Sequence, residues 1–148
     1  MPNKRKKRYV FLFVAYCVLM LWLLFGQRLG QAAAGLNLKP LRTLKIFWWT
    51  LRHSSNADFI RHAVINLVGN VAMFVPLGFF VPCIWTEVGK LGWHCLCMVV
   101  TIVLVELLQL VTGLGTCDVD DLLLNLIGTA IGFGLFKMWK RINRRGGS

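Results

Sequence analysis

Four long apolar stretches separated by polar segments dominate the pattern of this chain. They cover residues 9–25, 63–85, 91–111 and 122–139. A helix needs about 20 mostly apolar residues to cross the hydrocarbon core of a bilayer, and aromatic and basic residues anchor the ends of the two shorter stretches. The pattern therefore predicts an all-α membrane protein, a four-transmembrane-helix bundle, folded as one integral membrane domain over residues 1–148.

The polar connection after the first stretch contains a further predicted helix. Its apolar positions at helical spacing are Leu41, Leu44, Trp48 and Leu51. Basic residues occupy a neighbouring face, and Pro40 suits the start of a helix. A basic, tryptophan-rich helix is typical of one that lies in the plane of the lipid headgroups. We expect an interfacial amphipathic helix in the first external loop, which positions the second span rather than recognising one lipid.

Basic residues are concentrated in the two tails, residues 1–8 and 140–148. Four spans put both termini on one side of the membrane, and the excess of Lys and Arg in cytoplasmic segments favours the cytoplasm for that side. The first external loop also carries six basic residues, so the charges favour this orientation without forcing it. The net charge of +11 therefore reflects topology and contact with an anionic bilayer, and nucleic acid is disfavoured as a partner. A cleaved signal peptide ending near Ala32 and Ala34 is the alternative for the first segment, and an uncleaved helix is favoured.

The cysteines and histidines do not form the pattern of a disulfide framework or of a metal site. Five cysteines is an odd number, and most lie in or beside apolar stretches. His94, Cys95 and Cys97 are close in sequence, but no second cluster completes a tetrahedral ligand set. We read them as residues on the membrane faces of the helices, and we expect neither a metal nor a cofactor.

Acidic and amide residues gather at one end of the apolar stretches. Most of the six carboxylates fall between residues 106 and 121. A carboxylate near the bilayer centre costs about 2.5–3.5 kcal/mol, so such groups are usually paired or functional, and amides in lipid must be hydrogen-bonded. The candidate pocket residues, none with a catalytic role, are Asn66, Asn70, Glu106, Gln109, Asp118, Asp121 and Asn125.

The second and fourth spans open with a similar motif, Asn66-Leu67-Val68-Gly69 and Asn125-Leu126-Ile127-Gly128. In the fourth span the acidic and amide positions share one helix face with Gly128 and Gly132. Small residues let helices approach closely, so we expect these two glycines to contact a neighbouring helix. In the second span, Pro76 followed by Gly78 predicts a kink.

Two interpretations of the polar residues remain open. They could form a packing network, with Arg61 or His62 balancing Asp121 and Glu106. They could instead line a pocket that opens to the outer leaflet and binds a polar or lipid-linked ligand.

The spacing of these residues resembles that of the VanZ-like family of small bacterial membrane proteins. The matching segments are Asn70-Val71-Ala72-Met73-Phe74-Val75-Pro76-Leu77-Gly78, Glu106-Leu107-Leu108-Gln109, Gly115-Thr116-Cys117-Asp118-Val119-Asp120-Asp121 and Asn125-Leu126-Ile127-Gly128. The match covers about residues 58–136. Many members carry an arginine near Leu114 that this chain lacks. The resemblance implies a place in the bacterial plasma membrane and a structural motif that includes Phe74.

The family takes its name from a protein associated with low-level resistance to teicoplanin, a lipoglycopeptide, and no enzymatic activity is established for it. Together with the polar residues, the resemblance implies a non-enzymatic envelope protein whose outer-leaflet pocket alters the access of a lipoglycopeptide, or of a lipid-linked cell-wall precursor, at the membrane surface. The alternative is a membrane-embedded enzyme whose carboxylates act as acid and base or hold a divalent cation beside a phosphate. Against it stands the lack of a nucleophile–base pair near the acids, for which His62 is the only candidate histidine. A small transporter ranks last, because four short spans would need an oligomer.

Overall fold

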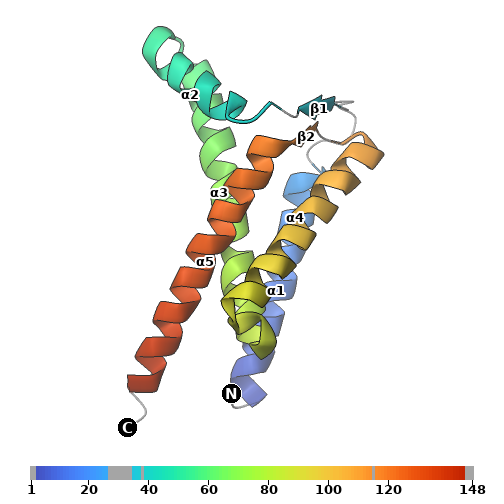
Figure 1. Cartoon of the computed structure of the whole chain (residues 1–148), viewed down its shortest axis with the longest axis vertical. Helices are drawn as coiled ribbons and strands as arrows, with labels where there is room; N and C mark the ends of the chain where they lie inside the picture. Colours follow the sequence, from blue (N-terminus) through green and yellow to red (C-terminus); the bar gives the residue numbers. More distant parts are fainter. Residues whose placement is uncertain (1–2, 27–34, 38, 115, 146–148) are drawn as a thin grey trace.

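The computed structural model describes residues 3–26, 35–37, 39–114 and 116–145. Its elements in chain order are α1 (Asn3–Leu24), β1 (Gly35–Asn37), α2 (Arg42–His53), α3 (Ala57–Ile84), a 3₁₀ helix (Thr86–Gly89), α4 (Leu91–Thr112), β2 (Thr116–Asp118) and α5 (Val119–Arg145). The helices α1, α3, α4 and α5 are each long and apolar enough to cross a membrane. The predicted all-α fold with four spans is confirmed, and both ends of the described chain lie at the same end of the bundle (Figure 1).

The helices extend beyond the apolar stretches from which they are predicted. The predicted tails are helical where they are described, because α1 begins at Asn3 and α5 continues to Arg145. Helix α3 begins six residues before the predicted position 63, where the side chain of Asn56 accepts a hydrogen bond of 2.9 Å from the Asp58 amide, a typical N-cap. Hydropathy marks the part of a helix that meets lipid, whereas backbone hydrogen bonding continues into polar residues.

One end of α3 projects beyond the rest of the bundle together with α2 (Figure 1). Helix α3 has 28 residues and is therefore about 42 Å long, more than the roughly 30 Å of a hydrocarbon core. The predicted helix in the loop after the first span is present as α2, which packs on α3. Thr50 is its buried residue, whereas Trp48 and Trp49 are exposed. The candidate cleavage site at Ala32 and Ala34 lies outside the described residues.

Helices α3 and α5 form the closest helix pair, and glycine makes this contact possible. A Cβ atom placed on Gly128 would overlap the backbone carbonyl oxygen of Val71, and one on Gly132 would overlap that of Val75. The contact is reciprocal, because a Cβ atom on Gly78 of α3 would overlap the carbonyl oxygen of Thr129. The structure therefore confirms the predicted contact role of Gly128 and Gly132, and it identifies α3 as their partner.

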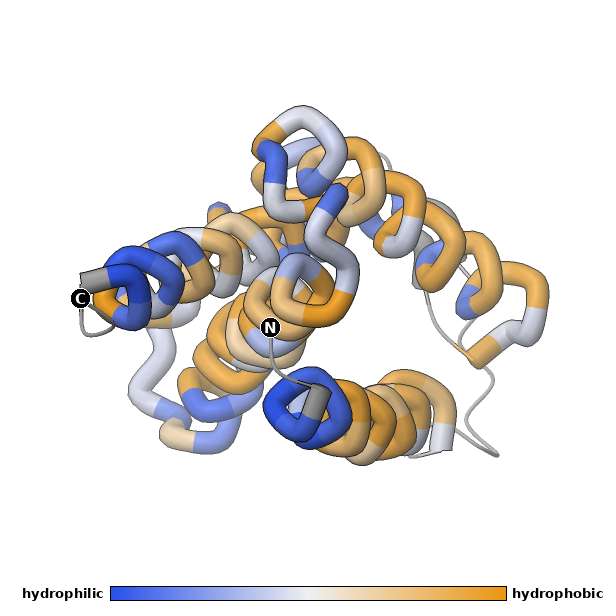
Figure 2. Tube along the Cα trace, turned by 90° about the horizontal axis from the view of Figure 1, so that it is seen from below, coloured by the Kyte–Doolittle hydropathy of each residue, from blue (hydrophilic) through white to orange (hydrophobic). Residues whose placement is uncertain are grey.

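The remaining spans pack around this pair through apolar side chains. Phe74 of α3 and Ile102 of α4 are fully buried, and Met20 and Leu24 of α1 complete the same cluster. A second cluster toward the termini is built on Cys83, Phe133 and Phe136. Viewed along the bundle, the apolar residues follow the lengths of the helices, and hydrophilic residues lie at the chain ends and at connections between helices (Figure 2).

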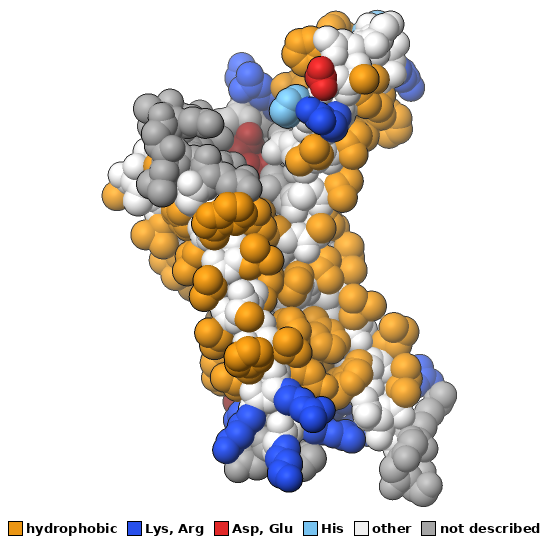
Figure 3. All heavy atoms as spheres, turned by 180° about the vertical axis from the view of Figure 1, so that it is seen from behind, with side chains coloured by type: hydrophobic (Ala, Val, Ile, Leu, Met, Phe, Trp, Pro, Cys, Tyr) orange, Lys and Arg blue, Asp and Glu red, His pale blue; other side chains and the backbone are white. Residues whose placement is uncertain are grey.

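The surface has the layered pattern of a membrane protein. On the face that Figure 3 shows, apolar side chains cover the middle of the bundle, and Lys and Arg side chains lie at its two ends, with a group of them at the end that carries the termini. Helix α3 continues through Pro76 and Pro82 without interruption. Proline cannot donate a backbone hydrogen bond, so Pro76 does not bond the carbonyl oxygen of Ala72 one turn earlier. The carbonyl oxygen of the next residue, Met73, accepts a hydrogen bond of 2.7 Å from the Tyr16 hydroxyl of α1.

A short parallel strand pair, which the sequence did not predict, closes the end opposite the termini. Strands β1 and β2 pair in the register Gly35 with Thr116 and Asn37 with Asp118. The pair joins the segment before α2 to the start of α5 (Figure 1). It therefore holds the predicted polar residues at the start of the fourth span beside the segment that leads into α2.

Candidate functional site

Most of the predicted polar residues lie at the end of the bundle that carries the strand pair. Asp118 is the residue before α5, and its carboxylate accepts two hydrogen bonds. One oxygen accepts from the Asp120 amide at 2.9 Å, which is the geometry of an N-cap residue. The other oxygen accepts from the side-chain amide of Asn37 at 2.8 Å. Asp118 therefore starts α5 and fixes β1 to it.

The carboxylate of Asp120 caps a different helix from its own. It accepts hydrogen bonds from the backbone amides of Leu41 at 2.5 Å and Thr43 at 2.6 Å, and it is only 3 % exposed. Leu41 precedes α2 with a φ of 62° and makes no capping hydrogen bond with its own side chain. A leucine in the left-handed region is strained, so the two bonds from Asp120 hold α2 in an otherwise unfavourable start.

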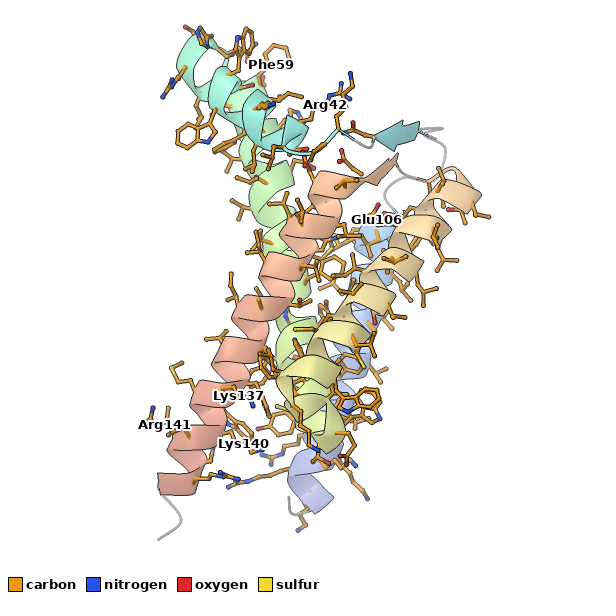
Figure 4. All side chains as sticks on the ribbon, in the orientation of Figure 1. Arg42, Phe59, Glu106, Lys137, Lys140 and Arg141 are labelled. Atoms are coloured by element: carbon orange, nitrogen blue, oxygen red, sulfur yellow. The ribbon has the colours of Figure 1, made fainter. Side chains whose placement is uncertain are left out.

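Glu106 and Gln109 of α4 are both 4 % exposed and lie on the inner side of that helix, where Figure 4 labels Glu106. The carboxylate of Glu106 accepts a hydrogen bond of 3.3 Å from the Asp118 amide. The Gln109 side chain donates one of 3.4 Å to the carbonyl oxygen of Leu24, one of the carbonyls at the end of α1 that lack a partner within the helix. Glu106 therefore links α4 to the start of α5, and Gln109 links α4 to the end of α1.

Asn70 connects this network to a groove between α1 and α3. Its amide nitrogen donates to the Asp121 carboxylate at 2.6 Å. Asn70 also lines a cavity of about 530 Å³, together with Asn66 and Tyr16 and with apolar side chains of both helices, among them Leu19 and Ile65. We refer to this cavity as the α1–α3 groove. It has amide groups on one wall and apolar groups around them, which suits an amphiphilic ligand.

Asn125 is buried between the helices at 3 % exposure. Its side-chain oxygen finds no hydrogen-bond partner among the described residues. A buried polar atom without a partner is costly, and native proteins usually satisfy such atoms with protein groups or water.

The structure thus divides the predicted pocket into two parts. Asn66 and Asn70 line the α1–α3 groove, whereas Glu106, Gln109 and Asp118 lie behind it in the network that joins α4, α5 and the strand pair. Arg61, proposed from sequence as a balancing charge, pairs with Asp58 at 3.4 Å on the exposed start of α3. Among the described residues, no group of three or more His, Cys, Asp or Glu is placed to hold a metal ion.

Three features of the structure were not predicted from the sequence, two around the groove and the strand pair and one toward the termini. Asp120 was counted among the carboxylates but given no role, although the lack of a capping residue before α2 is a signal that its cap comes from elsewhere. Tyr16 was missed because one hydroxyl in an apolar stretch has no pattern. His94, read as a residue on the membrane face, is instead 3 % exposed and stacks on Phe133 with ring centroids 4.1 Å apart.

Together, these features define a class of small multi-pass membrane protein. Two helices meet at a glycine contact, and buried carboxylates and amides gather at the end opposite the termini. A sequence model of the VanZ/LLP1 family matches residues 13–140, and the chain belongs to this family. No curated protein and no solved structure matches it. Membership supports a bacterial membrane protein of a family linked to glycopeptide resistance.

Proposed function

We propose that this protein is a non-enzymatic component of the bacterial cell envelope that contributes to resistance against teicoplanin-type glycopeptides or to envelope homeostasis. In this proposal both termini are cytoplasmic, so the α1–α3 groove opens in the outer leaflet. There it binds an amphiphile, either the lipoglycopeptide or a lipid-linked wall precursor. The observation that carries the proposal is the groove itself, a cavity of about 530 Å³ with Asn66 and Asn70 on an otherwise apolar wall.

The hydrogen bonds of the carboxylates favour binding over catalysis. Asp118 and Asp120 each accept two hydrogen bonds that hold backbone or side-chain groups in place. A general acid or base needs an oxygen within reach of the substrate, whereas these oxygens accept hydrogen bonds from the side chain of Asn37 and from backbone amides at the starts of α2 and α5. In the groove the polar side chains are the amides of Asn66 and Asn70 and the hydroxyl of Tyr16, which donates to the Met73 carbonyl oxygen. Groups of these types orient a ligand through hydrogen bonds without proton transfer at neutral pH.

The test is antibiotic susceptibility in a Gram-positive host that lacks the protein. Expression should raise the inhibitory concentration of teicoplanin more than that of vancomycin. Asn66→Leu and Asn70→Leu should each remove most of the shift at equal protein levels. Asn143→Leu is the matched control, because Asn143 is exposed and its amide bonds the Trp139 carbonyl at the far end of α5. No shift with the parent protein would rule out the resistance role, and a shift that survives both groove variants would place the site elsewhere.

The orientation is tested separately by labelling in intact cells. Ser55→Cys, in the exposed connection between α2 and α3, should react with an impermeant maleimide, and Asn143→Cys should react only after the cells are broken. The reverse result would place the groove in the inner leaflet and contradict the proposal.

A further inference from the structure

The last turns of α5 carry a stripe of four basic side chains at the end of the bundle opposite the α1–α3 groove. These residues line a depression of about 410 Å³ and are Lys137, Lys140, Arg141 and Arg144. They stand at positions i, i+3, i+4 and i+7, and therefore on one face of the helix. Figure 4 shows Lys137 and Lys140 reaching from α5 toward the neighbouring helices, with Arg141 on the opposite edge of the stripe.

Neutral partners hold the two lysines in place. The ammonium group of Lys137 donates a hydrogen bond of 2.8 Å to the Gly89 carbonyl oxygen and lies 4.9 Å from the centre of the Phe133 ring. The ammonium group of Lys140 lies 5.6 Å from the centre of the Phe136 ring. These contacts fix the positions of the charges without neutralising them, and each ammonium group still has donors to offer.

Acidic side chains do not neutralise the stripe within the described part of the chain. The ion pair found there joins Arg61 to Asp58 at the other end of the bundle. Glu87, in the nearby 3₁₀ helix, is exposed and accepts a hydrogen bond from the Thr86 hydroxyl. Like charges one helical turn apart repel each other, so an anion that enters the depression would relieve this repulsion.

We infer that this basic stripe is a binding site for the phosphates of an anionic lipid that carries two phosphodiesters. Lys137 and Arg144 are separated by about 10 Å along the helix axis, which gives room for two phosphate groups. A lipid fits better than a soluble anion, because Met138 and Ile142 are exposed beside the stripe and offer an apolar surface to acyl chains. Basic pockets at the ends of membrane helices bind headgroups of this kind.

The experiment uses native mass spectrometry of the full-length protein, offered an equal mixture of diphosphatidylglycerol, phosphatidylglycerol and phosphatidylcholine. The parent should retain diphosphatidylglycerol at least tenfold over phosphatidylcholine. The triple variant Lys140→Gln, Arg141→Gln, Arg144→Gln should lose this preference, and it keeps the Lys137–Gly89 contact and hence the fold. The matched control is Lys4→Gln, Arg5→Gln, Lys6→Gln, which removes three charges from the exposed start of α1 at the same end and should retain the lipid.

Three results of the lipid comparison would overturn the inference. The first is no preference in the parent, the second is equal loss in the α1 and α5 triple variants, and the third is equal retention of the lipids with one and two phosphates. A competition arm with inorganic pyrophosphate separates the sources of phosphate. Displacement only at concentrations far above those of the lipid supports the lipid as ligand. Displacement at equal concentration would assign the site to a soluble phosphate instead and overturn the lipid assignment.

Discussion

The glycine contact between α3 and α5 makes the sharpest prediction about stability. Gly132→Ala adds one methyl group where its carbon would overlap the backbone carbonyl oxygen of Val75. A flexible side chain could move away, but a helix backbone moves only if the two helices separate. Overpacking a core typically costs about 1–3 kcal/mol, and we expect this variant at the upper end of that range because the obstacle is backbone.

Gly134→Ala is the matched control, one half-turn away on the same helix. A Cβ atom there meets nothing within 4 Å, so the substitution should only reduce the freedom of the unfolded chain and stabilise the helix by about 0.5–1 kcal/mol. The two variants should therefore differ by about 3.5–4 kcal/mol, or several hundredfold in the unfolding equilibrium.

The free energy of unfolding can be measured by reversible denaturation in mixed micelles, followed by tryptophan fluorescence. Trp139 is a suitable reporter, because its ring packs against Tyr9 and Phe79 with centroids 5.6 and 6.2 Å away. If Gly132→Ala and Gly134→Ala have the same stability, the helices separate at no cost and the argument from close backbone contact is wrong.

Three further predictions concern the network around the α1–α3 groove. Asp120→Ala should remove the cap of α2 and lower the free energy of unfolding by about 0.5–2 kcal/mol. It should speed hydrogen exchange of the Leu41 and Thr43 amides and leave exchange at the centre of α5 unchanged; unchanged exchange in α2 would contradict the capping role. Leu41→Gly should be more stable than Leu41→Ala by about 1 kcal/mol, because only glycine adopts a φ of 62° without strain; equal stability would mean that the backbone there is relaxed. Tyr16→Phe should cost about 0.5–1.5 kcal/mol in the same assay through the lost hydrogen bond to Met73, whereas Tyr9→Phe, at a residue that packs through its ring, should cost less.

The apolar pattern was sufficient to predict the spans because each is a long local feature. It placed all four membrane helices and α2, and one helix face was enough to predict that Gly128 and Gly132 contact a neighbour. The first residues of the helices were harder to predict. The α3 start at Ala57 was missed because the first turns are polar, although the cap by Asn56 can be read in the sequence.

The connections between distant segments could not be predicted from the sequence. Strands of three residues have no measurable periodicity, and parallel pairing between residues 35–37 and 116–118 depends on how the helices bring them together. The cap that Asp120 gives to α2 spans 79 positions. A local rule can show that α2 lacks a capping residue of its own. It cannot identify the residue, so far away in the chain, whose carboxylate accepts the hydrogen bonds of the first amides.

These long-range contacts give the carboxylates a role that differs from that of the groove amides. Asp118 and Asp120 fix Asn37 and Leu41 to the start of α5, and Gln109 holds the carbonyl of Leu24 at the end of α1. The position of α1 beside α3, and hence the width of the α1–α3 groove, therefore depends on residues that do not line it. It follows that substitutions of Asp120 should change resistance and α2 exchange together. Asn66→Leu should change resistance alone, because Asn66 is exposed in the groove and lies outside this network.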